Sequence, residues 1–93
     1  VSLARLVKAA RTDPSRSAVS YKGVATVEAA LIDAGLLDKR YGDGHFGTAT
    51  VTAYARWQRS EAGGSYRGDA ADGIPGRNSL VKLGLKAGFK VVD

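Results

Sequence analysis

Two aspartates, Asp43 and Asp72, are the residues whose type and setting first suggest chemistry. A pair of carboxylates can act as general acid and general base in the hydrolysis of a glycosidic bond. Each of these aspartates, however, is followed directly by glycine. Aspartate side chains accept hydrogen bonds from nearby backbone N–H groups in turns, and glycine adopts a positive φ without steric cost. We therefore interpret both aspartates as turn and helix-capping residues and reject a catalytic pair.

The two aspartates begin two related segments. Residues 43–47 (Asp-Gly-His-Phe-Gly), the first corner, recur as residues 72–76 (Asp-Gly-Ile-Pro-Gly), the second corner. A hydroxyl residue and an aliphatic residue follow each copy at the same distance, as Thr50-Val51 and Ser79-Leu80. Because all these matches share one offset, we interpret them as a duplicated connection from a loop into a helix.

The sequence offers few donors for a metal ion. His45 is the only histidine, and there is no cysteine, so a zinc site of the usual nitrogen and sulfur ligands is not expected. The run from Asp69 to Gly73 lacks the alternating oxygen ligands and the terminal glutamate of a calcium loop. We predict no catalytic residue, no metal and no cofactor, and we expect His45 to be an exposed corner residue that touches ligand.

Aromatic and basic residues near the corners are candidates for ligand binding. Tyr41 and Tyr66 lie in the segments that lead into the two corners, where a ring can pack against the apolar face of a saccharide. Arginines there can bind carboxylates through both guanidinium nitrogens. Exposed tyrosines and arginines also occur without any ligand, and both interpretations stay open. The predicted ligand-binding residues are Arg40, Tyr41, Asp43, His45, Tyr66, Arg67, Asp72, Ile74 and Arg77.

Helices must position these residues. Apolar residues at helical spacing predict helices over residues 2–11, 24–35, 48–60 and 78–86. Their expected boundaries are Ser2 and Thr48 as N-caps, and Gly35 and Gly88 as C-terminal glycines.

Several residues are expected to pack on these helices. Trp57 is expected at the centre of the core, with Phe46 also packed inside, and Tyr21 of the connector 16–23 is expected to fold back onto it. Residues 89–91 alternate apolar and polar, which predicts an extended tail held on the surface by Phe89.

Composition limits the possible functions. The chain has 93 residues, 44% of them hydrophobic, and a net charge of +5. That length predicts one domain with a modest core, so binding is expected on a surface or in a shallow groove. No apolar run approaches the roughly 20 residues that span a bilayer, and we expect no membrane insertion. The first residue is valine and methionine is absent, which we interpret as a processed product or an excised piece. The positive charge favours anionic partners.

Three segments carry fixed residue types at fixed spacings. They are Val24-x-x-Val27-Glu28-x-x-Leu31-x-x-x-Gly35, then Asp43-Gly44-x-Phe46-Gly47-x-x-Thr50-x-x-Ala53-Tyr54-x-x-Trp57-Gln58, and Asp72-Gly73-x-x-Gly76-x-x-Ser79-Leu80-x-x-Leu83. In this order they resemble the peptidoglycan-binding domain of the three-helix family attached to bacterial and phage cell-wall hydrolases. Departures from the family pattern are Glu28 for glutamine, Tyr54 for a small aliphatic residue, Trp57 for phenylalanine, and Ile74-Pro75 in the second corner.

The resemblance implies a fold and a function. The implied fold is all-α: a small three-helix bundle with an extra N-terminal helix and two related Asp-Gly corners. It forms a single domain, 1–93, divided into an N-terminal helix and connector (1–23), a core repeat region (24–84) and a C-terminal tail (85–93). The implied function is non-catalytic binding of peptidoglycan or muropeptide in a groove between the two corners, which targets a covalently linked wall hydrolase such as an endolysin.

The resemblance also implies a setting, and two other interpretations stay open. The expected protein is a monomer at the cell wall or outside the cell, or released by phage onto the host wall, and it does not bind nucleic acid. The first alternative is a small basic helical DNA-binding module, for which the helix over residues 48–60 would need its polar residues in a groove. The second is an interaction module that uses the apolar face of the helix over residues 2–11.

Overall fold

The computed structural model describes residues 1–16 and 18–93, so one residue of the predicted connector, residue 17, lies outside the described part. Four α-helices follow one another, α1 (Leu3–Thr12), α2 (Gly23–Asp33), α3 (Thr48–Arg59) and α4 (Arg77–Ala87). Three short 3-10 turns lie between them, η1 (Asp13–Ser15), η2 (Lys39–Tyr41) and η3 (Gly68–Ala70). Within the described residues the only β-pairing is an isolated bridge between Ser2 and Val92. The predicted all-α class is confirmed.

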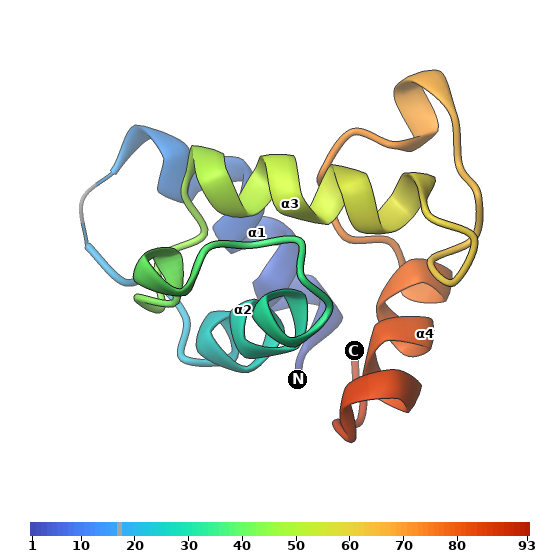
Figure 1. Ribbon diagram of the computed structural model, residues 1–93. Coiled ribbons are helices and arrows are strands. Elements are labelled where there is room, and N and C mark those ends of the chain that lie inside the picture. The colour runs from blue at the N-terminus through green and yellow to red at the C-terminus, as the bar shows by residue number, and fades with distance from the viewer. Residues whose placement is uncertain (17) are drawn as a thin grey trace.

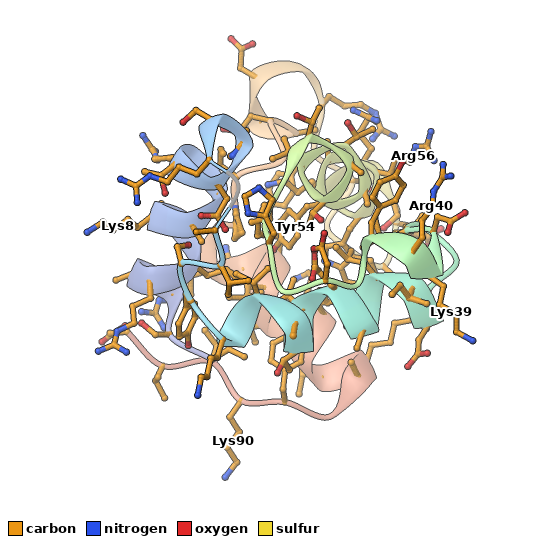
Figure 2. The ribbon with its side chains drawn as sticks, turned by 90° about the vertical axis from the view of Figure 1, so that its left-hand side faces the viewer. Lys8, Lys39, Arg40, Tyr54, Arg56 and Lys90 are labelled. Atoms are coloured by element: carbon orange, nitrogen blue, oxygen red, sulfur yellow. The ribbon has the colours of Figure 1, made fainter. Side chains whose placement is uncertain are left out.

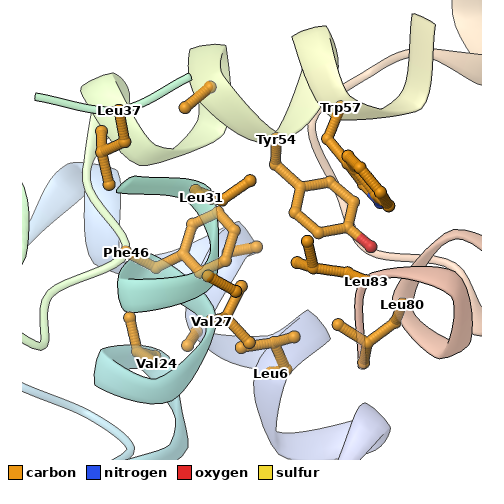
Figure 3. Close-up of a cluster of buried hydrophobic side chains, with 14 residues drawn as sticks. Leu6, Val24, Val27, Leu31, Leu37, Phe46, Tyr54, Trp57, Leu80 and Leu83 are labelled. Atoms are coloured by element: carbon orange, nitrogen blue, oxygen red, sulfur yellow. The ribbon is translucent and has the colours of Figure 1, made fainter. Parts of the chain in front are cut away.

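Helix α2 is the central element of the bundle, because α1, α3 and α4 all contact it. In Figure 1, α3 lies across the molecule above α1 and α2, and α4 lies below the C-terminal end of α3. The helices bury one continuous cluster of apolar side chains (Figure 3). The larger members of this cluster are Leu6, Val24, Val27, Leu31, Leu37, Phe46, Tyr54, Trp57, Leu80 and Leu83.

Helix α1 is part of the core rather than a flanking element. Leu6, Ala9 and Ala10 are buried, and Ser2 caps the helix by accepting a hydrogen bond from the Arg5 N–H at 3.3 Å. The C-terminal tail runs beside the start of α1, where the Leu3 N–H donates to the carbonyl of Val92 at 2.7 Å. The apolar face of α1 is therefore buried within the molecule. The alternative of an interaction module that binds a partner through this face thereby loses its basis.

The predicted helix boundaries are close to the observed ones, with two corrections. Thr48 is the first residue of α3 and not its cap, because Gly47 occupies the N-cap position and has no side chain to offer. Helix α4 begins at Arg77, one residue before the predicted start. The C-terminal glycines behave as expected, with φ of +76° at Gly35 and +91° at Gly88.

Trp57 is buried as predicted, at the side of the core where α3 meets α4. Its indole Nε1 donates a hydrogen bond to the carbonyl of Ser79 at 2.8 Å. Tyr54 is also fully buried, and its hydroxyl lies 2.7 Å from the Ser79 hydroxyl. Figure 3 shows Tyr54 beside Trp57, with Phe46 on the other side of Tyr54, toward Leu31 and Val27 of α2. The tyrosine and phenylalanine rings, 6.4 Å apart, occupy the middle that the sequence assigned to tryptophan.

Candidate functional site

The first corner is a turn tied to α2. Asp43 Oδ1 accepts a hydrogen bond from the His45 N–H at 3.0 Å, and Gly44 has a φ of +81°. The N–H of Gly44 donates to Glu28 Oε1 at 2.8 Å, and the Thr50 hydroxyl donates to Glu28 Oε2 at 2.7 Å. One buried carboxylate therefore joins the corner and the first turn of α3 to α2.

The second corner repeats this construction with α3 as its support. Asp72 Oδ1 accepts from the Ile74 N–H at 2.9 Å, and Gly73 has a φ of +80°. Gln58 Oε1 accepts from the Gly73 N–H at 2.8 Å, and Gln58 Nε2 donates to the Ile74 carbonyl at 2.9 Å. These bonds confirm the turn role predicted for Asp43 and Asp72. The predicted helix-capping role is wrong, because glycines occupy the N-cap positions of α3 and α4 and neither helix has a side-chain cap.

Glu28 and Gln58 are equivalent anchors with different charge, and sequence reasoning missed the role of both. Burial raises the pKa of Glu28, while the hydrogen bonds from Thr50 and Gly44 oppose that rise. Gln58 performs the same task as a neutral amide. The available signal was the placement of each polar side chain on the buried stripe of its helix, because a buried polar group has to find a hydrogen-bonding partner.

Asp13 is a further structural residue, and the sequence analysis predicted no role for it. It is fully buried, and its carboxylate accepts from the Ser20 hydroxyl at 2.5 Å and from the Phe46 N–H at 2.9 Å. His45 Nδ1 lies 3.9 Å from the same carboxylate and 3.2 Å from the carbonyl of Ala18. Asp13 and His45 therefore hold the first corner against the chain between α1 and α2.

A hollow of about 560 Å³, the first hollow, lies beside the first corner. Tyr41, Asp43 and His45 are among its lining residues, with Pro14 and the start of α3 from Gly47 to Thr50. Because no side chain caps α3, backbone N–H groups of its first turn are free to meet a ligand. The partial positive charge of a helix N-terminus favours an anionic group there.

A second hollow of about 330 Å³ lies beside the second corner and the start of α4. Helix α4 also has a glycine, Gly76, as its N-cap and no side-chain cap. The Arg77 guanidinium pairs with the carboxylate of Asp93 in the tail. The hollow is lined by Gln58, Tyr66, Asp69, Ala70, Asp72, Ile74, Gly76, Arg77, Asn78 and Ser79.

The predicted ligand residues are therefore divided between two places. The first and second hollows share no lining residue, so each corner has a hollow of its own, and the single groove predicted between the corners stays a prediction. The first corner joins α3 at Thr50, through Glu28, while the second corner bonds to the Gln58 side chain and packs against the carbonyl of Val51.

Arg40 and Arg67 line neither hollow. The Arg40 guanidinium lies over the ring of Tyr41, 4.8 Å from its centroid. Arg67 donates to the backbone carbonyls of Arg59 and Tyr66, at 2.8 and 2.9 Å. Both arginines are thus engaged with their own surroundings.

Two properties of the whole described chain bear on its chemistry. Among residues 1–16 and 18–93, no three side chains of the histidine, cysteine, aspartate or glutamate type gather where they could hold a metal ion. In the same residues, every helix is too short or too polar to cross a bilayer.

In comparisons with known proteins, no family model, curated protein or solved structure matches this chain.

Proposed function

We propose that this chain is a non-catalytic module that binds peptidoglycan or its muropeptide fragments. One observation carries the proposal: each of the two related corners leads into a helix whose N-terminus lacks a side-chain cap and opens on a hollow. Muropeptides carry carboxylates on their stem peptides, and carboxylates are the groups that an uncapped helix N-terminus favours.

The roles of the site residues follow from their positions. The N–H groups of Thr48 and Ala49 would bind a carboxylate in the first hollow, and those of Arg77 and Asn78 would bind one in the second. Tyr41 and Tyr66, each beside one hollow, would pack against a sugar ring or a peptide methyl group. The net charge of +5 adds long-range attraction for an anionic polymer.

The construction of the corners supports the family resemblance on which the proposal also rests. The aspartate, the first glycine and the hydroxyl residue of the motif each have a structural task in this chain, through hydrogen bonds made by Asp43, Gly44 and Thr50. Glu28, where the family pattern has glutamine, receives two of these bonds. A departure from the pattern at Glu28 therefore keeps the hydrogen-bonding function of the position.

A module of this size is expected to bind one wall fragment with modest affinity, because each hollow is shallow. Its use would come from tethering: a weak binding module raises the local concentration of a linked wall hydrolase near an insoluble substrate. We propose that its place of action is the cell wall, and that the catalytic step belongs to the linked domain.

The test is retention of the full chain on purified cell-wall sacculi and on duplex DNA, each over a range of salt concentrations. The proposal expects retention on sacculi. Thr48→Asp places a carboxylate at the mouth of the first hollow, where it competes with the ligand, and should reduce this retention. Thr52→Asp is the matched control, because it adds the same charge to an exposed position one turn along α3. Equal retention of both variants would contradict the site, and no retention of the parent chain would contradict the function.

One feature favours the DNA-binding alternative strongly enough to keep it in this test. Arg56 and Arg59 lie on the exposed side of α3. Figure 2 shows Arg56 near Arg40, on the side of the molecule opposite Lys8, and Arg56 and Tyr41 line one shallow depression. Retention on duplex DNA with a steep salt dependence, and none on sacculi, would assign these arginines to phosphate contacts and replace our proposal.

A further inference from the structure

A third hollow, the basic hollow, lies against α1 and shares no lining residue with the first or second hollow. Its volume is about 380 Å³, which is within the range of about 300–1,000 Å³ that small-molecule pockets occupy. Its lining includes the cationic side chains of Arg5, Lys8 and Arg16 and the ring of Tyr21. The proposed wall-binding function uses none of these residues.

The positive charge of the basic hollow is not neutralised by acidic side chains. Among the described residues, no carboxylate lies within ion-pair distance of Arg5, Lys8 or Arg16, whereas Arg40 pairs with Asp38. Three cations around one hollow repel one another, so a bound anion would relieve this repulsion as well as gain direct contacts. The hollow therefore has the electrostatic character of an anion site.

Part of the basic hollow is held in a defined geometry. The Tyr21 hydroxyl accepts a hydrogen bond from the Ser2 N–H at 2.8 Å, and its ring lies so close over Gly23 that a Cβ there would overlap it. The Arg5 guanidinium lies 6.0 Å from the centroid of the same ring. The aromatic ring is thereby fixed, with the Arg5 guanidinium next to it.

The remaining groups complete the hollow from two elements. Lys8 and Thr12 follow Arg5 along α1 and line the hollow with it, and Figure 2 shows Lys8 projecting outward from that helix. Arg16 comes from the chain after η1, where its N–H donates to the Asp13 carbonyl at 2.9 Å. The cations therefore surround the hollow from both sides instead of forming a stripe along one helix.

We propose that the basic hollow binds the phosphate monoester of a small sugar. Three cations match the double negative charge of a phosphate monoester better than the single charge of a carboxylate, and guanidinium groups bind phosphate oxygens in pairs. The ring of Tyr21 offers a face for the apolar side of the sugar, and the polar residues Thr12 and Ser20 are part of the same lining. A compact hollow with one aromatic ring suits a small ligand, while nucleic acid would require an extended basic path.

The experiment is an NMR titration of the full, nitrogen-15-labelled chain with glucose 1-phosphate, glucose and inorganic phosphate, each at physiological salt. Glucose 1-phosphate should shift the amides of Arg5, Lys8, Thr12, Arg16 and Tyr21, and should bind more tightly than inorganic phosphate because it also contacts the ring. Glucose alone should produce no shift. If glucose 1-phosphate leaves these amides unchanged, or binds no better than inorganic phosphate, the proposal is overturned.

Paired variants distinguish binding in the basic hollow from attraction to general surface charge. Arg5→Gln with Arg16→Gln should weaken binding by about tenfold or more, because hydrogen bonds to charged groups are among the strong ones. Lys82→Gln with Lys86→Gln removes the same charge from exposed positions of α4 and should leave the affinity within about twofold, since salt screens distant charges. Equal weakening by both pairs would overturn the proposal. So would tighter binding of a short duplex DNA than of glucose 1-phosphate. Shifts at the corner amides on adding muropeptide test the wall-binding proposal independently.

Discussion

Replacement of Glu28 tests the corner construction most directly, because one side chain there holds two buried donors. In Glu28→Ala the Gly44 N–H and the Thr50 hydroxyl both lose their acceptor. Each unsatisfied buried donor costs about 1–3 kcal/mol, so the loss of both acceptors should lower the free energy of unfolding by about 2–6 kcal/mol. That is a large part of the stability of a small domain.

Glu28→Gln should behave in the opposite way. An amide can accept from the Gly44 N–H and donate to the Thr50 oxygen, as Gln58 accepts and donates at the second corner. It also avoids the burial of a charge. Glu28→Gln should therefore equal or exceed the parent protein in stability at pH 7, with its corner intact.

The contribution of Glu28 to stability depends on pH with a definite sign. Burial raises the pKa of Glu28 in the folded state, while Thr50 and Gly44 lower it, Asp43 raises it and His45 lowers it to smaller extents. The folded protein therefore binds a proton that the unfolded chain releases between pH 4.5, the ordinary value for this group, and the raised folded pKa. Glu28 thus contributes stability below pH 4.5, and this contribution is lost as the pH rises through the folded value.

The assay is urea unfolding of the parent protein, Glu28→Gln and Glu28→Ala, followed by far-UV circular dichroism from pH 4 to pH 7. The stability advantage of Glu28→Gln over the parent should be largest at pH 7 and should shrink as the pH falls toward 4.5. Other titrating groups are common to both proteins and cancel in the difference. A gap that does not change with pH, or a Glu28→Gln protein as unstable as Glu28→Ala, would refute this reasoning.

Three further substitutions probe other parts of the fold, each by the same unfolding assay. Gly73→Ala should lower the free energy of unfolding more than Gly68→Ala. Both glycines have a positive φ, but only a Cβ at residue 73 collides with a backbone carbonyl of α3. Equal losses of stability would contradict tight packing of the second corner. Asp13→Ala leaves two donors without their acceptor and should lower the free energy of unfolding by about 2–4 kcal/mol. The control Asp33→Ala, at an exposed position, should lower it by less than about 0.5 kcal/mol. Trp57→Phe removes the indole hydrogen bond to α4 and should lower the free energy of unfolding by about 1–3 kcal/mol. An unchanged urea midpoint of unfolding would show that this bond does not hold α4.

Local chemistry accounts for the parts of the fold that were predictable. An aspartate followed by glycine forms its turn through bonds that span two residues, as Asp43 does with His45. The apolar periodicity of α2 and α3 predicts which faces are buried without any knowledge of their neighbours. The N-cap of α3 was assigned one residue late, because Thr48 is a favoured capping type while Gly47, which takes the position, offers no side-chain signal.

The site was less predictable because it depends on which surfaces meet. Asp13 and Phe46 are far apart in the chain, and no local pattern indicates that the carboxylate of one accepts from the backbone of the other. The basic hollow likewise combines Arg5 of α1 with Arg16, which follows η1. Its residues are scattered in sequence, so a search for runs of charge does not find them.

The sequence by itself determined the helical class, the two Asp-Gly turns and the burial of Trp57, because each depends on interactions within a few residues or on the period of one helix. Only the tertiary structure decided that each corner lies beside a hollow of its own. The second corner contacts α3 through the Gln58 side chain and packs against the carbonyl of Val51, and no local pattern in the sequence indicates which elements meet around each corner.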